Sequence, residues 1–387
     1  MDRPAPWQSA HETDVLELIS GDGCLEAARA PLKPDAVEQL VVEMRQADPN
    51  TDWTEKLEQR ISELTGFPHT VAVSSGDAGL GQALFAAGVR PGDEVIVPSY
   101  APVSIADVVV SLEAVPVLID IDEQTLLLTA EAVNDAVSDR TRAVIAVHVG
   151  GLAVPIEPLA QVAACHGLIL IEETNGPGPG ILCRSRTQRA DIVCFRFDAI
   201  SHFPMNRGGA VCTTDPEVAG RLRLQRLPAP PLSDVPLLVR GQGISQLAAA
   251  WEYMRLASVK ERWRRRCQIA MTWSAGFGGS FEFQVPTEIP GQPHCWNQYM
   301  LRLNLQRCSI SRVELVEQLR QRGVRVGIHY LPIHMHQRFQ NHMGYGADTF
   351  PVARNEFLRE LTLPINSDMS DSEVDLVWTS LMAILKA

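Results

Sequence analysis

The sequence predicts an α/β protein with a large, doubly wound, mostly parallel sheet and a smaller α+β domain after it. Up to about residue 220, short apolar runs alternate with helical patterns. The runs are apolar at consecutive positions, as in strands that are buried on both faces of a parallel sheet. After about residue 270 the order becomes less regular. We therefore expect an N-terminal arm over 1–50, a large α/β domain over 51–265 and a small C-terminal domain over 266–387.

The arm and the large domain are expected to form these elements in order. The arm contains one helical stretch, AVEQLVVEMRQA, between polar and proline-flanked segments. A second helix is expected over DWTEKLEQRISELTG, because Leu57, Ile61 and Leu64 fall on one face. Strands follow, separated by helices such as GLGQALFAAG and PIEPLAQVAACHG. The strand sequences are TVAVSS, DEVIVPS, AVPVLIDI, RAVIAVHV, LILIEE, ADIVCFRF and GGAVCTT.

A proline-rich stretch separates these strands from the rest of the chain. LPAPPLSDVPLLVRGQG, over 227–243, is too rich in proline for a helix or a central strand, so a long loop is expected there. A helix then begins near Ile244 and includes the basic run from Arg262 to Arg266, which we interpret as a solvated helix face. In the small domain, FEFQV, YMLRLNL and VRVGIHYLP are expected to be strands, and RVELVEQLRQRG and SEVDLVWTSLMAIL helices.

Composition excludes several classes of partner. The 387 residues carry a formal net charge of −12, which repels phosphate backbones and anionic bilayers, so neither nucleic acid nor a membrane is expected to bind. No apolar targeting segment follows a basic start, and the eight cysteines form no Cys-x-x-Cys pair. We therefore expect a cytoplasmic protein without disulfides or zinc. No metal is expected at His329, His334 and His336, because no acidic or cysteine ligand lies near them in the sequence.

Residues that follow strands are the first candidates for a site, because ligands of open parallel sheets bind beyond the carboxyl ends of the strands. Glu172 and Glu173 end one strand, where a buried carboxylate with a raised pKa can act as an acid or a base. A salt bridge to arginine is the alternative. His148 ends another strand and is either catalytic or structural. Tyr100 and Asn175 are candidates for substrate contacts.

Ordered segments along the chain give it a family resemblance. They are PGDEVIVPS, PVLIDIDEQT, TRAVIAVHVGG, GLILIEE, RGGAVCTTD and HYLPIH. From about residue 50 onward the chain resembles the DegT/DnrJ/EryC1/StrS sugar aminotransferases, which are fold type I enzymes that use pyridoxal phosphate (PLP). The resemblance implies a homodimer, with clefts completed by loops of the partner. It also implies that HYLPIH faces the site, so that His329, Tyr330 and His334 line the substrate cleft.

The covalent anchor of the cofactor departs from the family pattern. The resemblance places the Schiff-base lysine at residue 201, eight residues before Gly209, and this sequence has Ser201 there. Only four of the 34 basic residues are lysine, and none of the four can plausibly substitute. The next residue, His202, invites comparison with the 3-dehydratase branch of the family, in which a histidine replaces the lysine. A loop histidine without a role is the alternative.

The implied phosphate and ring contacts depart as well. After Gly76, Asp77 replaces the expected threonine of the phosphate loop, and Arg196 replaces a serine that donates to the phosphate. We expect these two side chains to form an ion pair in the vacated pocket. The other three departures lie at the ring-stacking position, at the family glutamine and at the partner of the pyridinium nitrogen. They are Pro102, Leu152 and Glu173.

These departures predict a repurposed enzyme without PLP. We expect acid/base chemistry on a small polar or sugar-like molecule in specialised-metabolite biosynthesis, with no cofactor. The candidate catalytic residues are Glu173, His148, His202 and Ser201. One alternative is an aminotransferase or 3-dehydratase-like enzyme that binds PLP or pyridoxamine phosphate (PMP) without a covalent bond. The other alternative is an inert partner of an active aminotransferase.

Overall fold

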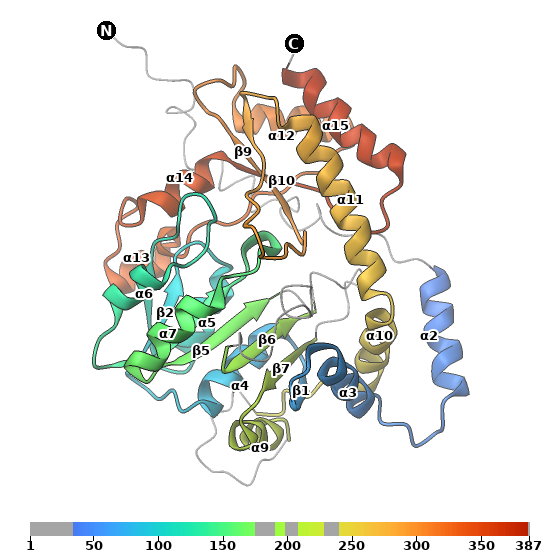
Figure 1. Cartoon of the computed structure of the whole chain (residues 1–387), viewed down its shortest axis with the longest axis vertical. Helices are drawn as coiled ribbons and strands as arrows, with labels where there is room; N and C mark the ends of the chain where they lie inside the picture. The colour runs from blue at the N-terminus through green and yellow to red at the C-terminus, as the bar shows by residue number, and fades with distance from the viewer. Residues whose placement is uncertain (1–33, 175–189, 198–207, 228–239, 386–387) are drawn as a thin grey trace.

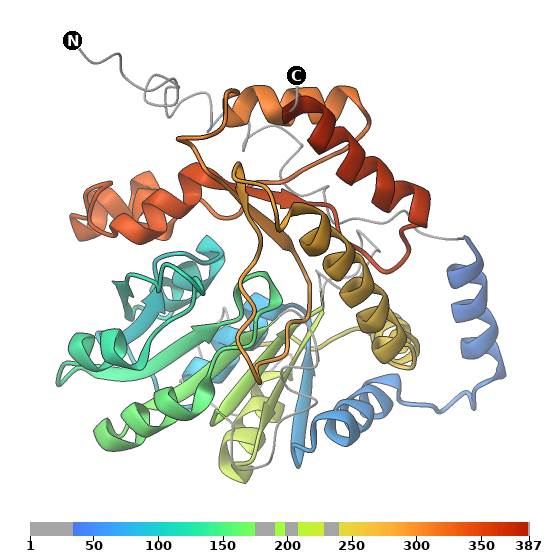
Figure 2. The ribbon, with the colours of Figure 1, turned by 45° about the horizontal axis from the view of Figure 1, so that its top comes forward.

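The computed structural model of the chain describes residues 34–174, 190–197, 208–227 and 240–385 (Figure 1). The described residues form two parts, each with its own sheet. A large sheet with helices on its faces lies at one end, and a smaller sheet with its own helices lies at the other (Figure 2). Helix α11, Val259–Phe277, leads from the first part into the second.

The large sheet confirms all seven predicted strands, in the order β1-β7-β6-β5-β4-β2-β3. Neighbouring strands from β6 to β3 are parallel, whereas β7 is antiparallel to both β6 and β1. The strands are almost entirely buried, which explains their unbroken apolar character. Their bounds are β1 His69–Val73, β2 Glu94–Pro98, β3 Val115–Ile119, β4 Thr141–Val147, β5 Ile169–Thr174, β6 Ile192–Arg196 and β7 Gly209–Thr213.

Helices cover the faces of this sheet, and several begin at side-chain caps. Asp52 accepts hydrogen bonds from the first backbone amides of α3, Trp53–Thr65, and Asp215 does the same for α9. Leu57 and Ile61 of α3 are fully buried, as predicted, and Leu64 packs against the same apolar cluster. The other helices of this part are α4 Gly76–Ala86, α5 Val103–Ser111, α6 Ala130–Ala136, α7 Ile156–His166 and α9 Pro216–Gln225.

Two more helices frame one edge of the large sheet. The predicted arm helix is α2, Pro34–Gln46, which stands at the outer edge of the molecule (Figure 1). It packs through Leu40 and Met44 against a cluster that includes α10, Gln246–Leu256. The proposed boundary at residue 265 stays a prediction, and α11 continues across it.

The small sheet has the order β10-β9-β8, with bounds Glu360–Leu363, Tyr299–Leu303 and Phe283–Gln284. Its apolar side is covered by α11, α12 (Arg312–Gln321) and α15 (Asp371–Leu385). The strand predicted at VRVGIHYLP does not form and β10 takes the place beside β9, which corrects the sequence prediction. The reason is local: the His329 amide donates to the carboxylate of Glu360 at 2.7 Å, not to a backbone ladder.

The predicted proline-rich loop lies partly outside the described residues. The long loop over 227–243 is described at 227 and at 240–243, where Gly243 bridges to Val73. No helix in the described ranges is long and apolar enough to cross a membrane.

Candidate active site

The beginning of α4 is occupied by an arginine from β6. Ser75 is the N-cap of α4, and its hydroxyl accepts from the Ala78 amide. Arg196 ends β6, and its Nη2 lies 2.7 Å from Oδ1 of Asp77 in the first turn of α4. This ion pair confirms the predicted one. A carboxylate is favoured at a helix N-terminus, and the guanidinium fork suits it.

Gly76 shows how closely Arg196 covers this helix end. A Cβ atom at residue 76 would lie 2.8 Å from both Cβ and Cγ of Arg196 and 3.1 Å from its Cζ. Real Cβ atoms do not approach other carbons so closely, so only glycine fits against the arginine stem. The side chain of Arg196 thus packs directly on the backbone where α4 begins.

Glu173 is the second acid on the same guanidinium. Its Oε1 lies 3.2 Å from Nε of Arg196, and only 6% of its side chain is exposed. The salt-bridge alternative for this residue is therefore what the structure contains. Arg196 holds one carboxylate from the sheet and one from the helix, and the three side chains form a compact acid–base–acid cluster.

Glu172 and His148 form a separate pair. His148 Nε2 lies 2.6 Å from Oε1 of Glu172, and both side chains are essentially buried. Because Glu172 and Glu173 are consecutive in β5, their side chains lie on opposite faces of the sheet. His148 is thus bound to the carboxylate on the face away from the Arg196 cluster. A catalytic role for His148 stays a prediction.

Tyr330, in the HYLPIH segment, interacts electrostatically with Glu173 and Arg196. Burial raises the pKa of the Tyr330 hydroxyl, the charge of Glu173 raises it further, and Arg196 opposes this, so the three groups lie in one electrostatic neighbourhood. The hydroxyl donates to Oε1 of Gln298 at 3.2 Å. Tyr330 also makes an edge contact with Tyr100, with ring centroids 5.9 Å apart. Because its single proton is donated to Gln298, the phenol oxygen is available to accept a hydrogen bond from a ligand.

The rings of Tyr100 and His329 both pack edge-on against the ring of Tyr330. Tyr100 is fully buried, and its hydroxyl donates to the His329 carbonyl. The His329 ring shares a hydrogen bond of 2.9 Å with the Thr362 hydroxyl, and burial lowers the pKa of His329 to about 4. The imidazole is therefore neutral near pH 7. Substrate contacts by Tyr100 and His329 stay predictions.

His334, the third residue predicted to line the cleft, is fully buried. Its Nε2 lies 3.1 Å from the Ala347 carbonyl, so this nitrogen carries the proton. Burial is the main cause of its lowered pKa. The ring packs edge-on against Phe350, with centroids 5.0 Å apart. The His334 ring thus binds the backbone of Ala347, and a contact with substrate stays a prediction.

Sequence reasoning missed Gln298 and Glu360. Gln298 holds the Tyr330 hydroxyl, and Glu360 is a fully buried acid beneath His329. Burial raises the pKa of Glu360 to about 8, against the opposing effect of hydrogen bonds from Thr362 and His329. Both come from the small domain, where periodicity gives no sign of which side chains face the cleft. The alternation of ELTL at 360–363 was the one available signal for Glu360.

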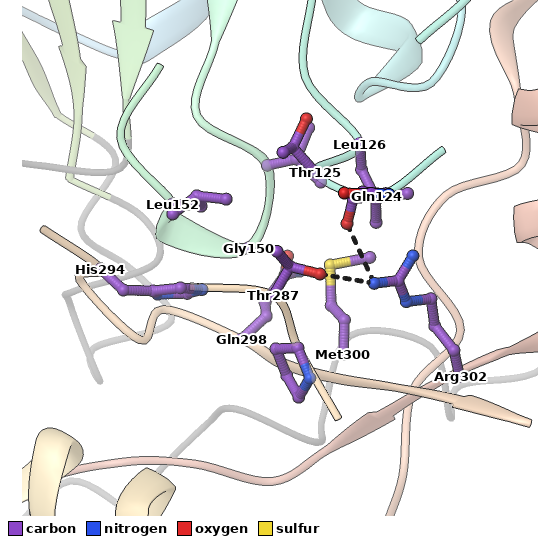
Figure 3. Close-up of a pocket in the computed structure, with 12 residues that line it drawn as sticks. Gln124, Thr125, Leu126, Gly150, Leu152, Thr287, His294, Gln298, Met300 and Arg302 are labelled. Carbon is purple, nitrogen blue, oxygen red and sulfur yellow. Dashed lines mark hydrogen bonds between the residues drawn. The ribbon is translucent and has the colours of Figure 1, made fainter. Parts of the chain in front are cut away.

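Gln298 is one of the residues that line a small pocket (Figure 3). The Oε1 atom of this residue accepts the hydrogen bond from Tyr330. Its volume of about 20 Å³ holds roughly one water molecule. Arg302 forms one wall, and its guanidinium donates to the Gln124 carbonyl and the Thr287 hydroxyl. The pocket is too small for a sugar, so it does not itself hold a substrate.

The remaining predicted residues are placed as follows. Pro102 is the N-cap of α5, and Leu152 is buried and bridges to His294. Ser201, His202 and Asn175 lie outside the described residues. Across the ranges that the structure describes, no three histidine, cysteine, aspartate or glutamate side chains are grouped to hold a metal ion.

The large mostly parallel sheet and the small C-terminal sheet define a protein of the fold type I aminotransferase class. Solved structures of that class superpose over most of the chain. DesV from S. venezuelae, in complex with a ketimine intermediate, is 25% identical with a TM-score of 0.79, covering 93% of this chain and 99% of its own. The aminotransferase TlmJ from Streptoalloteichus hindustanus is 27% identical with a TM-score of 0.78 and the same coverage.

A more distant structure shows the same fold. NtdA from Bacillus subtilis, with bound cofactor PMP, is 20% identical with a TM-score of 0.79, covering 92% of this chain and 83% of its own. The model of the DegT/DnrJ/EryC1/StrS aminotransferase family matches residues 37–382. The chain belongs to this family.

Proposed function

We propose that this chain is a family member that has lost the covalent use of PLP and acts without it on a small polar, sugar-like molecule. The proposal rests on one observation above all: Arg196 lies on the beginning of α4 and bridges Asp77 and Glu173. We place the reaction in specialised-metabolite biosynthesis, and acid/base chemistry is the class that the remaining cleft residues support.

The described residues do not fit the phosphate group of PLP. A phosphate binds a helix N-terminus through open backbone amides. Here the stem of Arg196 packs on Gly76, and the Ser75 hydroxyl already caps α4. Two carboxylates around one guanidinium leave an excess negative charge, which repels a phosphate dianion. We therefore infer no step through the cofactor.

The residues that remain support acid/base chemistry. Glu173 is a buried carboxylate at a strand end, and Tyr330 holds a phenolic proton in the same electrostatic neighbourhood. Gln298 and Tyr100 orient Tyr330 from two sides. We propose that the Tyr330 oxygen accepts a hydrogen bond from a substrate hydroxyl while Glu173 accepts a proton from a neighbouring carbon or hydroxyl. His202, beside Ser201, is a further proton-transfer candidate from the sequence.

Cofactor binding and turnover test this proposal together. The purified chain is titrated with PLP and with PMP, and binding is followed by calorimetry. We expect no saturable binding of either. Sugar-like pathway intermediates are then incubated with the chain alone, and product is sought by mass spectrometry. Glu173→Gln and Tyr330→Phe are each expected to lower turnover by about a hundredfold.

Each contrary result identifies an alternative. Saturable PMP or PLP binding with cofactor-dependent turnover would replace the proposal by a non-covalent aminotransferase or dehydratase, for which the PMP-bound relative is the model. Co-purification with an active aminotransferase, and no turnover by the chain alone, would replace it by the inert-partner function.

We also propose a homodimer. The clefts of this family are expected to be completed by loops from a two-fold partner, and such an interface is self-complementary. Light scattering at micromolar concentration is expected to give twice the 42.5 kDa chain mass. A monomer mass would refute the dimer without affecting the cofactor proposal. The cytoplasmic location stays a prediction.

A further inference from the structure

Arginine side chains form a face along the inner side of α10 and α11. Arg262 and Arg266 are four residues apart on one side of α11, and Arg255 lies in the last turn of α10, just before α11 begins. Burial is the main cause of the lowered pKa of Arg255, to about 10, and the charges of Arg262 and Arg266 lower it further. We call these three residues the arginine face. This corrects the expectation of a wholly solvated run, because within 262–266 only Arg264 is largely exposed.

Arg255 is the most buried member of the arginine face and has unpaired donors. Only 8% of its side chain is exposed. Its Nε and Nη2 atoms have no hydrogen-bond partner among the described residues. Burying charged N–H groups without acceptors is costly, so such groups in folded proteins usually meet a water, an ion or a ligand.

Arg266 presents a second unpaired donor. Its Nε atom is buried and has no hydrogen-bond partner within the described ranges. Burial is the main cause of the lowered pKa of Arg266, and the charge of Arg262 lowers it further. Like charges drawn together in a low-dielectric region repel, unless an anion lies between them.

The arginine face looks onto the junction of the large and small domains. Between Arg262 and Arg266, Trp263 donates from Nε1 to the His294 carbonyl at 3.0 Å, which fixes the helix against the loop before β9. The charge of Arg266 contributes to the lowered pKa of the His294 ring. His294 also lines the small pocket that Gln298 lines.

The nearby acids leave these donors unsatisfied. Glu252 lies one turn before Arg255, and its Oε2 is 3.9 Å from the arginine Nε, which is too long for a hydrogen bond. Asp368 acts on Arg255 through its charge. Three guanidinium groups against these two carboxylates leave a net positive charge at the junction. The arrangement calls for another acceptor.

We propose that the arginine face is a binding site for an oxyanion of the phosphate class, held by Arg255 and Arg266. The guanidinium fork matches the oxygens of a phosphate and binds them through charge-assisted hydrogen bonds. The ligand is a phosphorylated small molecule or inorganic phosphate. The site is separate from the Arg196 cluster and does not depend on the cofactor proposal.

Thermal unfolding of the full-length chain tests the site. Inorganic phosphate is titrated at constant ionic strength, balanced with sodium chloride, and a sugar phosphate and acetate are titrated in parallel. A ligand that binds only the folded state raises the melting temperature in a saturable way. We expect saturable stabilisation by phosphate, a stronger effect of the sugar phosphate if that is the natural ligand, and no saturable effect of acetate.

Substitutions locate the site. Arg255→Gln and Arg266→Gln are each expected to weaken phosphate binding by at least about tenfold, because each removes a charged donor. Arg264→Gln is the matched control, since Arg264 is on the same helix with 67% of its side chain exposed. It is expected to bind phosphate as the parent does. Each variant's melting temperature without phosphate shows that it folds.

Three results would overturn the proposal. One is a parent protein without saturable stabilisation by phosphate. Another is undiminished binding by both Arg255→Gln and Arg266→Gln. The third is an equal effect of acetate, which would assign the site to carboxylates.

Discussion

Nη2 of Arg196 lies 2.7 Å from Oδ1 of Asp77, and this contact joins the end of β6 to the first turn of α4. A cation at the positive end of a helix dipole is unfavourable by itself. The two acids that share Arg196 offset this, so the arginine and the acids belong together as one unit. The N-terminus of α4 is consequently covered by the side chain of Arg196, whose charge is balanced by Asp77 and Glu173.

Removing Arg196 is expected to destabilise the fold. Arg196→Met leaves the buried Glu173 carboxylate without its partner, and we expect a loss of about 2–4 kcal/mol in the free energy of unfolding. Asp77→Ala is expected to cost less, about 0–1 kcal/mol, because 42% of the Asp77 side chain is exposed. Urea denaturation measures both. Equal losses for the two variants would contradict the unequal burial of the two acids.

Gly76→Ala is expected to destabilise the protein because the added methyl group meets the stem of Arg196 at 2.8 Å. We expect a loss of about 1–3 kcal/mol, typical of overpacking. Gly220→Ala is the matched control, since Gly220 is inside α9 with open space at its Cβ position. It is expected to be neutral or to stabilise by about 0.5–1 kcal/mol. A neutral Gly76→Ala variant would show that Arg196 does not cover α4 so closely.

Asp120 is expected to stabilise the contact between β3 and α14, Pro351–Arg359. Its carboxylate accepts from the Val352 and Ala353 amides, both at 2.9 Å, and so caps a helix that lacks a cap of its own. Asp120→Ala is expected to cost about 1–2 kcal/mol. Asp348→Ala, which removes a largely exposed acid from the same region, is expected to cost about 0–1 kcal/mol. Thermal denaturation compares the two, and similar small losses would refute the capping role.

Glu360 is expected to make stability depend on pH. Its pKa is raised to about 8 in the folded protein, so the folded state binds the proton more tightly than the unfolded state. The resulting stabilisation is complete below the unfolded pKa and is lost as pH rises toward about 8. His329, with its pKa lowered to about 4, gives the opposite slope while the unfolded chain still binds its proton near the usual histidine pKa, so Glu360 is isolated by the difference between the parent and a variant that lacks this carboxylate.

Glu360→Gln removes this titration. We expect the parent's free energy of unfolding, relative to that of the variant, to fall by about 1 kcal/mol or more between about pH 6.5 and 8. Urea denaturation at several pH values measures the two slopes. Parallel slopes for parent and variant would contradict a protonated Glu360.

The sequence predicted the large sheet from its consecutive apolar runs, and it predicted the Arg196–Asp77 pair from the resemblance, which places both residues at the phosphate site of the family. The two residues are far apart in the chain, because Asp77 is in the first turn of the helix after β1 and Arg196 ends β6. The partner of His148 could not be predicted so simply. It depends on which face of β5 carries Glu172 and which carries Glu173.

The roles of Gln298, Glu360 and the arginine face could not be predicted for a different reason. These residues take their roles from how the small domain packs on the large one. No periodicity within a single helix or strand specifies that packing. The basic run at 262–266 therefore looked like a solvated surface, although Arg262 and Arg266 are partly buried.

Borohydride trapping tests the central claim most directly. The purified chain and its Ser201→Lys variant are incubated with PLP, reduced with borohydride and digested for mass spectrometry. We expect no site-specific pyridoxyl adduct on Lys33, Lys56, Lys260 or Lys386 of the parent. In the variant we expect no transaminase activity, because Arg196 and Asp77 still hold the beginning of α4. A stoichiometric adduct on one lysine of the parent, with aminotransferase turnover, would contradict the account.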